Sequence, residues 1–559
     1  MTAATYALIA LAAIAWLVHV ARVALVAARM LQVEEYESLR FLRWGVTQAW
    51  LLHRSVLLAV VISLPALLLA LFAHDQASRV VAAGWLTASL SAAVVWRWIP
   101  PKKPLVLTAR MRRILAAAGV LASLPAVAAA LLLVRGRWLA AGVLVLVLVG
   151  LTTALSQALL VGANLFLTPV EAFVRRHYLR LARDKMRALS PLVVAIAGSY
   201  GKTSTKHILA ALLVPSVETL PTRRSFNTLM GVSKVINEDL APQHRVFLVE
   251  MDAYGPGEIA AISDLVRPRI AVLTAVGPQH LERFGSVQRI ADALYEVIAS
   301  LPPDGVAVMH AGEDTIGQLC ERASGEGRNV VRYGMNAATS SGTRPVDDSQ
   351  KPCLDVIAED VRLHREGATF RWSWPARGLA RDVSIPLLGR HQVLNVTAAL
   401  SVVAILGHDL DAAVAAAQSL EPVEHRLQPV SAAGPITVID DSYNANPVGV
   451  HNGLDVLATM DGGRKILVTP GLVELGSVEY QENRRYGEHA ASVCSDVIVM
   501  DARPARALRE GLLAGGLDES HIHTARSLDE ATAIISRVGR PGDVVLFAND
   551  LPDTYLSTK

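Results

Sequence analysis

The hydrophobic positions of this chain are concentrated in its first third, where five long apolar stretches stand out. They lie near residues 4–28, 55–74, 79–99, 115–134 and 138–163. Each approaches or exceeds the ~20 residues that a helix needs to cross the hydrocarbon core of a membrane. The first stretch lacks the basic segment of a signal peptide, and further stretches follow it. The pattern predicts a transmembrane domain of about five helices over residues 1–165.

Basic residues are distributed unevenly among the connections between these stretches. The connections near residues 40–54 and 102–113 are rich in arginine and lysine, as is the segment after the last stretch, whereas the other two are poor in them. Because basic loops stay in the cytoplasm, we expect a multi-pass protein of the bacterial inner (plasma) membrane, with its N-terminus outside and its catalytic domains in the cytoplasm. No charged pair recurs within the spans, which favours an anchor over a transport pathway.

Residues 166–190 follow a different pattern, in which arginines alternate with apolar positions. The segment from 168 to 189 carries its apolar residues at helical spacing. A basic amphipathic helix of this kind is typical of a membrane surface. We therefore expect a juxtamembrane linker here.

From residue 191 onward the pattern is that of a soluble α/β protein, in which short Val/Ile-rich runs alternate with helical stretches. We expect a mostly parallel sheet with helices on both faces over residues 191–422, with an antiparallel insertion at about 340–385. Residues 423–559 predict a second, Rossmann-like unit. Its strands are expected at ITVID, KILVTP, DVIVMD and VVLFA.

One segment of the central unit has the pattern of a phosphate-binding loop. A buried strand is predicted at 192–197 and a helix at 205–214, and a glycine-containing turn joins them. Backbone N–H groups at such a turn approach the phosphates of ATP, and the helix N-terminus adds positive potential. We expect Lys202 to reach the β/γ-phosphates and Thr203 to hold Mg²⁺. The expected nucleotide-binding residues are Gly198, Ser199, Tyr200, Gly201, Lys202, Thr203 and Ser204.

Composition agrees with a membrane-attached enzyme. The chain of 559 residues is 52% hydrophobic and only 18% charged, and its formal net charge is +3. No basic run with interleaved aromatic residues is present, so we expect no nucleic-acid partner. The three cysteines, Cys320, Cys353 and Cys494, have no metal-ligand spacing, which favours a reducing compartment.

Further motifs, spaced in order along residues 190–559, resemble those of the Mur ligase family, which joins amino acids to cell-wall precursors with ATP. They are GSYGKTST (198–205), TRRSFNTLMGV (222–232), VEMDAYGPGEIAAI (249–262), PRIAVLTAVGPQHLERFGS (268–286), LLGRHQVLNVTAAL (387–400), IDDSYNANP (439–447) and VTPGLVELG (468–476). The most specific of these is IDDSYNANP. Within the family, the set is most similar to the branch that adds D-alanyl-D-alanine to UDP-muramoyl-tripeptide.

The resemblance implies a mechanism and a set of site residues. ATP would phosphorylate a carboxylate of the acceptor, and an amine would then attack the acyl phosphate. Besides Lys202, it implies catalytic and metal-binding roles for Glu250 and His280. It also implies nucleotide contacts from Asn395, which would lie near the adenine, and, in the third domain, from Arg426, Asp440 and Tyr443. The residues expected to contact the substrates are Thr222, Asn227, Asn444 and Asn446.

The chain departs from the family pattern at four places. Leu294 stands where the family carries a lysine, which is carbamylated to help hold a second metal ion. His310 stands where the family has an asparagine. Residues 544–555 lack the Lys-Gly-Ser segment of the dipeptide-adding branch. Membrane helices replace the N-terminal domain that grips the UDP-sugar, which favours an acceptor held in the membrane.

The sequence therefore predicts an ATP- and Mg²⁺-dependent amide ligase that acts on a cell-wall or lipid-linked carboxylate acceptor at the inner face of the membrane. An amino acid or peptide would supply the amine, and a cell-envelope synthesis protein is a candidate partner. Three alternatives remain. One is a poly-γ-glutamate-type polymer synthase, and another is a non-catalytic, nucleotide-binding scaffold of a cell-envelope complex. The third is a membrane transport ATPase. It would need a coupling helix set and intramembrane polar groups, and the sequence indicates neither.

Overall fold

A computed structural model gives the fold of the chain. It describes residues 2–47, 53–96, 104–223, 226–279, 281–312, 314–336, 353–430, 436–443 and 445–549. The chain divides into two compact units, Met1–Arg176 and His177–Lys559.

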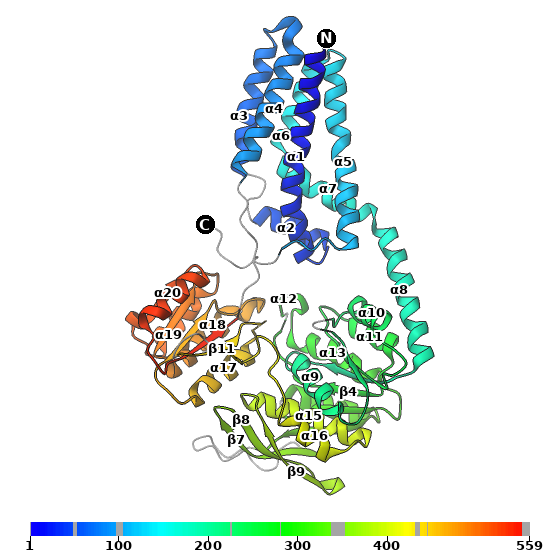
Figure 1. Ribbon diagram of the computed structural model, residues 1–559, viewed down its shortest axis with the longest axis vertical. Coiled ribbons are helices and arrows are strands. Elements are labelled where there is room, and N and C mark those ends of the chain that lie inside the picture. The colour runs from blue at the N-terminus through cyan, green and yellow to red at the C-terminus, as the bar shows by residue number, and fades with distance from the viewer. Residues whose placement is uncertain are drawn as a thin grey trace. The chain divides into compact units, whose positions relative to one another are not determined.

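The first unit is built of helices, namely α1 (Ala3–Val33), α2 (Ser38–Thr47), α3 (Arg54–Ala70), α4 (Ala77–Val95), α5 (Ala109–Val134), α6 (Trp138–Gly150) and α7 (Thr152–Phe166). Of these, α1, α3, α4 and α5 run alongside one another (Figure 1). In α4, Ala82, Trp85, Ala88 and Ala92 form a buried stripe at helical spacing. Small residues in this stripe let neighbouring helix backbones approach closely, which is typical of helices packed within a membrane.

In the part of the chain that the structure describes, the apolar stretches are helical over most of their length, but the number of spans is not confirmed. Within the described residues, α1, α4 and α5 are each long and apolar enough to cross a membrane, and α3, with 17 residues, is shorter. The prediction of one helix over residues 138–163 is wrong, since α6 and α7 are bent by 81° at Leu151. The Thr152 hydroxyl stabilises this break by donating to the carbonyls of Leu148 and Val149.

The linker segment forms α8 (Thr168–Leu189), the helix that the sequence predicts at 168–189. Only Ala182 and Met186 of this helix are buried. Phe173 and Leu181 are exposed apolar side chains on the same helix. Its placement at a membrane surface stays a prediction.

The second unit begins with a nine-stranded sheet in the order β2-β3-β1-β4-β5-β6-β7-β8-β9. Its strands are β1 (Leu192–Ala197), β2 (Thr219–Pro221), β3 (Val246–Glu250), β4 (Ile270–Leu273), β5 (Val306–His310), β6 (Asn329–Met335), β7 (Val356–His364), β8 (Gly367–Trp374) and β9 (Leu379–Ile385). Neighbours from β2 to β7 pair in parallel, and β7-β8-β9 pair antiparallel. This confirms the parallel sheet and the antiparallel insertion, of which residues 337–352 lie outside the described part.

Helices cover both faces of this sheet (Figure 1). They are α9 (Lys202–Leu213), α10 (Leu229–Glu238), α11 (Glu258–Val266), α12 (Leu281–Phe284), α13 (Val287–Ala299), α14 (Asp314–Gly325), α15 (Arg390–Leu406) and α16 (Leu410–Ala417). In β1, Val193 and Ala195 face a core with α10, α11, α13 and α14, whereas Val194 and Ile196 face a core with α9, α15 and α16. This two-residue alternation buries both faces, as expected of a parallel strand.

A second, six-stranded sheet has the order β10-β11-β15-β12-β13-β14. Its strands are β10 (Gln428–Val430), β11 (Thr437–Asp441), β12 (Lys465–Thr469), β13 (Asp496–Met500), β14 (Ile522–Ala525) and β15 (Val544–Ala548), and its helices are α17 (Pro447–Thr459), α18 (Glu479–Val493), α19 (Ala505–Ala514) and α20 (Leu528–Val538). The four predicted strands are confirmed. Strands β10 and β14 are only three and four residues long, and the sequence pattern does not indicate them.

Two glycines let α18 and α19 pack closely. A Cβ at Gly487 would collide with the backbone carbonyl of Leu508, and a Cβ at Gly511 would collide with that of Arg484. Neither glycine has a positive φ. The requirement is therefore for space between the helices rather than for an unusual backbone conformation.

We expect Gly487→Ala to lower the thermal midpoint of unfolding, because the helices must separate to admit the methyl group. Gly317→Ala is the matched control. Gly317 lies in α14 with open space around its Cβ position, so the substitution should stabilise by roughly 0.5–1 kcal/mol through helix propensity. Calorimetry measures the thermal midpoint of unfolding of both variants. Equal shifts of the midpoint with the same sign would contradict close packing at Gly487.

Candidate nucleotide and metal site

The phosphate loop lies between the carboxyl end of β1 and the start of α9. Its two glycines have positive φ angles, 142° at Gly198 and 80° at Gly201. Gly201 is the N-cap of α9 in the left-handed conformation, which a residue with a Cβ adopts only at a cost. A Cβ at Gly198 would also collide with the Thr274 hydroxyl. Both glycines are therefore required by the turn that directs the helix N-terminus toward the nucleotide.

The segment after β4 holds this loop in place. The Ser199 N–H donates to the Ala275 carbonyl at 2.7 Å. The Ser199 hydroxyl donates to the Gly277 carbonyl at 3.1 Å and accepts from the Gly277 N–H at 3.0 Å. The Thr274 hydroxyl donates to the Tyr200 carbonyl. These backbone and side-chain hydrogen bonds hold the loop in a fixed orientation without a ligand.

Lys202 is buried at the start of α9. Its Nζ donates to the Gly198 carbonyl at 2.6 Å and lies 3.3 Å from Oδ1 of Asp252. Its side chain is only 7% exposed, so the ammonium group depends on these partners for its solvation. The structure thus places Lys202 within the phosphate loop, as the sequence predicts.

Glu250 ends β3 and is enclosed by cationic and hydroxyl donors from α9. Thr203 Oγ1 donates to Oε1 of Glu250 at 3.0 Å, and Lys206 Nζ donates to Oε2 at 2.9 Å. Burial alone would raise the pKa of the Glu250 carboxyl, but the charge and hydrogen bond of Lys206 outweigh it, so that the pKa is lowered. Glu250 is therefore a carboxylate at neutral pH, next to the hydroxyl expected to bind Mg²⁺.

Two residues predicted to bind substrate lie beside this carboxylate. The Thr222 hydroxyl accepts a hydrogen bond from the Glu250 N–H at 3.2 Å. The Asn227 amide donates to Oε1 of Glu250 at 3.2 Å and to Oδ2 of Asp252 at 3.5 Å. The TRRSFNTLMGV segment therefore reaches the end of β3, although Arg224 and Ser225 within it lie outside the described residues.

The groups collected here suit Mg²⁺. Thr203, Glu250 and Asn227 supply hydroxyl, carboxylate and amide oxygens, the ligands that this hard cation prefers. Within the described residues, no group of three or more His, Cys, Asp or Glu side chains has the arrangement of a metal site. His280, the expected ligand of a second metal ion, lies outside the described residues, so its role stays a prediction.

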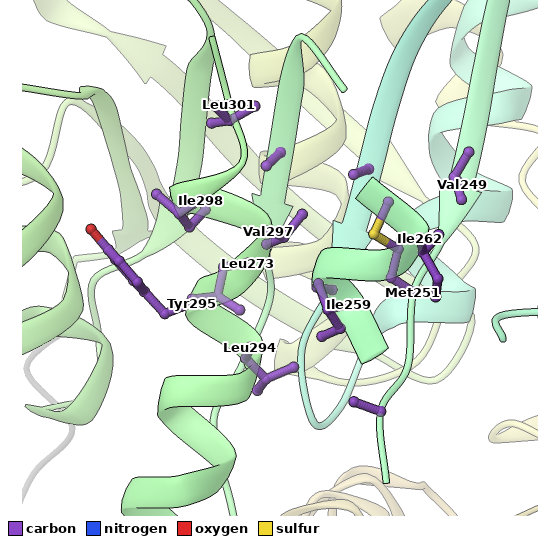
Figure 2. Packing of buried hydrophobic residues seen from close by; sticks show 14 of the residues in the cluster. Val249, Met251, Ile259, Ile262, Leu273, Leu294, Tyr295, Val297, Ile298 and Leu301 are labelled. Carbon is purple, nitrogen blue, oxygen red and sulfur yellow. The ribbon is translucent and has the colours of Figure 1, made fainter. Parts of the chain in front are cut away.

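Leu294 is part of the hydrophobic core, where the resemblance would place a charged lysine. It lies on α13 and is 4% exposed, in one cluster with Met251 and Ile259. Figure 2 shows its side chain directed toward Ile259 on α11. Leu294 also lines a small cavity that Gly198 and Asp252 border.

Two other predicted contacts of the central unit have defined places. Asn395, on α15, accepts from the Thr205 hydroxyl at 3.2 Å and donates to Gln392 Oε1 at 3.1 Å. It lies against the phosphate loop, since a Cβ at Gly201 would come within 2.8 Å of its Oδ1. His310 ends β5 against the ring of Tyr333, and burial lowers its pKa to about 4. His310 is therefore neutral and does not add charge to the site.

The predicted residues of the third domain form a second group. The Arg426 guanidinium lies over the Tyr443 ring, 5.0 Å from its centroid. Asp440 Oδ2 is 2.7 Å from Nδ1 of His425. This hydrogen bond raises the pKa of His425. A cation, an aromatic ring and a carboxylate thus gather at the carboxyl end of β11.

The asparagines of IDDSYNANP have different positions. Asn446 is the N-cap of α17 and accepts from the Gly449 N–H at 2.7 Å, which is a structural role of the kind that turn asparagines commonly have. Asn444 lies outside the described residues. The sequence analysis did not consider Asn549, which accepts from the Ala445 N–H at 3.4 Å and donates to the Gly471 carbonyl at 2.6 Å.

Several polar groups of the two sites were missed from the sequence. Lys206 lies four residues after Lys202 on α9 and therefore on the same helix face. Asp252 lies two residues after Glu250, at the spacing that returns a side chain to the same side of a strand. Both spacings are visible in the sequence. The contacts of His425 and Asp441 depend on the β10–β11 pairing, which no motif indicates.

Asp441, at the end of β11, generates a pH-dependent prediction. Leu427 N–H donates to its Oδ1 at 3.2 Å, and burial, partly opposed by Arg426, raises the pKa of its carboxyl to about 7. The folded state therefore binds a proton that the unfolded state has already lost. The stabilisation is complete below the unfolded pKa of 3.8 and is lost as the pH rises through about 7.

We expect Asp441→Asn to remove this loss of stability at high pH, because the asparagine amide has the shape of the carboxyl group but carries no charge at any pH. The free energy of unfolding of the variant, relative to the parent protein, should rise by roughly 2 kcal/mol between pH 5 and pH 8. Calorimetry over this range measures it, and Asp461→Asn, at an exposed position of the same domain, is the control. A difference that stays constant with pH would contradict a raised Asp441 pKa.

Comparisons with known protein families identify relatives of both domains of the second unit. The model of the Mur ligase middle domain matches residues 196–403, and that of the Mur ligase glutamate ligase domain matches residues 425–549. The UDP-N-acetylmuramoyl-tripeptide–D-alanyl-D-alanine ligase of Escherichia coli (strain K12) is 33% identical over 346 residues, which are 62% of this chain and 70% of the relative. The enzyme of that name from Mycobacterium tuberculosis (strain H37Rv) is 31% identical over 375 residues, 63% of this chain and 69% of the relative.

Solved structures give the same result. A crystal structure of MurF from Acinetobacter baumannii is similar with a TM-score of 0.58 and 26% identity, covering 68% of this chain and 78% of that one. MurF ligase from Thermotoga maritima in complex with ADP is similar with a TM-score of 0.57 and 25% identity, covering 67% and 80%. The family models, the relatives and the phosphate loop agree, and the chain belongs to the Mur ligase family of ATP-dependent amide ligases of peptidoglycan synthesis.

Proposed function

We propose that this ligase joins an amine to a carboxylate acceptor of the cell envelope through an acyl phosphate, at the inner face of the membrane. The observation that carries the proposal is the grouping of Lys202, Thr203 and Glu250 at the carboxyl ends of β1 and β3, where parallel α/β sheets bind their ligands. Mg²⁺ bound by Thr203 and Glu250 would neutralise charge on the transferred phosphoryl group.

In this mechanism an acceptor carboxylate oxygen attacks the γ-phosphorus of ATP, and the bond from that phosphorus to the ADP oxygen breaks. The amine nitrogen then attacks the acyl carbon, inorganic phosphate leaves, and the amine loses a proton. Lys202 and the N–H groups of the loop would hold the phosphoryl group in line for the first step. Asn227, hydrogen-bonded to Glu250, would orient the acceptor carboxylate beside it.

The third domain would supply the remaining contacts to the nucleotide. Arg426 and Tyr443 offer a cation and a ring face to a planar base or a ribose, and Asp440 offers a carboxylate to the ribose hydroxyls. Asn395 would contact the adenine, and Asn444 and Asn446 would line the same cleft. The stacking of Arg426 on Tyr443 supports this role, because it fixes both side chains before the ligand binds.

The acceptor that we propose is a lipid-linked muropeptide. Its support is the N-terminal unit, in which apolar helices occupy the residues before the part that matches the relatives. The relatives are named for adding D-alanyl-D-alanine, so we propose an amino acid or a dipeptide as the amine. An anionic polymer such as poly-γ-glutamate is the alternative acceptor with the same chemistry.

Leu294 favours a second candidate function, a nucleotide-binding scaffold of a cell-envelope complex without catalysis. A buried leucine cannot contribute charge to a second metal site. The contacts of Lys202, Thr203 and Glu250 favour the enzyme. A scaffold that only binds nucleotide does not require ionised groups arranged for phosphoryl transfer.

We expect full-length protein in detergent to release phosphate from ATP only with a matched acceptor and amine, supplied as inner-membrane lipid extract and a pool of amino acids and dipeptides. Lys202→Ala should abolish this release by removing the phosphate contact. Lys234→Ala, an exposed lysine on α10, is the matched control and should retain it. Nucleotide binding without turnover under every condition would support the scaffold, and hydrolysis indifferent to both additions would contradict the ligase.

We also propose that the N-terminus lies on the outer side of the membrane and that the catalytic domains lie in the cytoplasm. Cys353 is an exposed native reporter of the central unit, whereas Cys320 and Cys494 are buried. A membrane-impermeant maleimide should label Cys353 in inverted vesicles but not in intact spheroplasts. Thr2→Cys, made in a Cys353→Ser background, should give the opposite result. Labelling of both positions from the same side would contradict this orientation.

A further inference from the structure

The carboxylate of Asp252 has no role in the mechanism described above, yet it is fixed at the phosphate loop. Its side chain is 14% exposed, and Oδ1 lies 3.3 Å from Nζ of Lys202. Its backbone N–H donates to the Asn227 carbonyl at 3.0 Å. Oδ1 also accepts from the Ala253 N–H at 3.1 Å, and Oδ2 accepts from the Asn227 amide at 3.5 Å. The carboxylate is thus held by backbone and side-chain contacts rather than by Lys202 alone.

The charges at this site balance in pairs without a ligand. Lys206 pairs with Glu250 at 2.9 Å, and Lys202 pairs with Asp252 at 3.3 Å. The first pair is fully buried, whereas the second borders the loop, where Asp252, Gly198 and Ser199 line one small cavity. Lys206 therefore forms a buried ion pair with Glu250. Lys202 is the ammonium group that borders the phosphate loop, where we expect the phosphates to bind.

Nucleotide binding changes this balance. Contact of Lys202 with the β/γ-phosphates would weaken its attraction to Asp252, because the phosphates would compete with that carboxylate for the ammonium group. The Asp252 carboxylate then faces the phosphates as a like charge, in a site where little water screens it. A divalent cation held by Thr203 and Glu250 together with the nucleotide would compensate this repulsion, because it would add two positive charges to the site.

We propose that Asp252 is a positioning residue that makes nucleotide binding depend on Mg²⁺: it holds Lys202 in the free enzyme and opposes the nucleotide when the metal ion is absent. The proposal rests on the nucleotide site of the proposed function and adds a control on when that site is filled. Free ATP or ADP would bind poorly, and the magnesium complex would bind well.

The test measures the affinity of full-length protein in detergent for ADP by isothermal titration calorimetry, in EDTA and in excess Mg²⁺. Asp252→Asn keeps the size of the side chain but removes its charge and frees Lys202. We expect this variant to bind ADP in EDTA more tightly than the parent protein, on the order of tenfold, and to gain less affinity from Mg²⁺. Asp252→Glu retains the charge on a longer side chain and should keep most of the Mg²⁺ dependence.

Asp292→Asn, at an exposed position of α13, removes the same charge away from the site and should leave both affinities unchanged. Thermal unfolding of each variant checks that it is folded. Equal loss of affinity in EDTA and in Mg²⁺ on Asp252→Asn would overturn the proposal, since that is the result of a merely structural role, as would unchanged affinities. Should Asp252→Asn fail to fold, an Asp252→Glu variant that binds ADP equally well with and without Mg²⁺ would overturn it. Parent protein that binds no ADP in either condition would overturn the proposed function as well.

Discussion

The buried ion pair between Lys206 and Glu250 is the constraint around which the nucleotide site is organised. Both side chains are almost completely enclosed, at 0% and 2% exposure. An unpaired charge at this depth would cost several kcal/mol, so Glu250 can remain ionised only while α9 stays in its place next to β3. The pair fixes the distance between the helix that starts at the phosphate loop and the strand that carries Glu250, the carboxylate that we propose as a metal ligand. The Thr203 hydroxyl and the Asn227 amide both donate to Oε1 of the same carboxylate.

This arrangement explains why the site is preorganised but electrostatically neutral. Two lysines pair with two carboxylates, one of an aspartate and one of a glutamate. The glycines let the loop turn into the N-terminus of α9. In the proposed mechanism, a nucleotide would bring negative charge into this balanced site, and a metal ion would restore the balance. The chemistry of phosphoryl transfer needs the same compensation, because charge develops on the transferred group. Under this proposal, binding and catalysis would depend on one set of charges.

Much of this fold could be predicted from the sequence because its signals are local. The strand, glycine turn and helix around Lys202 lie within about two dozen residues, and the central strands are apolar runs. The bend at Leu151 could not be predicted, since it lies inside one continuous apolar stretch and no proline stands at the break. The partners of Asp252 and His425 come from segments distant in sequence. The sequence shows the positions of these groups along the chain but not the pairing.

The most direct test of the central claim, that an acceptor carboxylate is activated by phosphorylation, follows an oxygen atom. The full-length ligase is incubated with ATP, an amine and acceptor whose carboxylates carry ¹⁸O, and the released phosphate is analysed by mass spectrometry. An acyl-phosphate mechanism transfers one ¹⁸O from each acceptor carboxylate into inorganic phosphate, because the attacking oxygen leaves with phosphorus. We expect that single label in step with amide formation. Unlabelled phosphate accompanying amide formation, or label found in AMP, would contradict the mechanism.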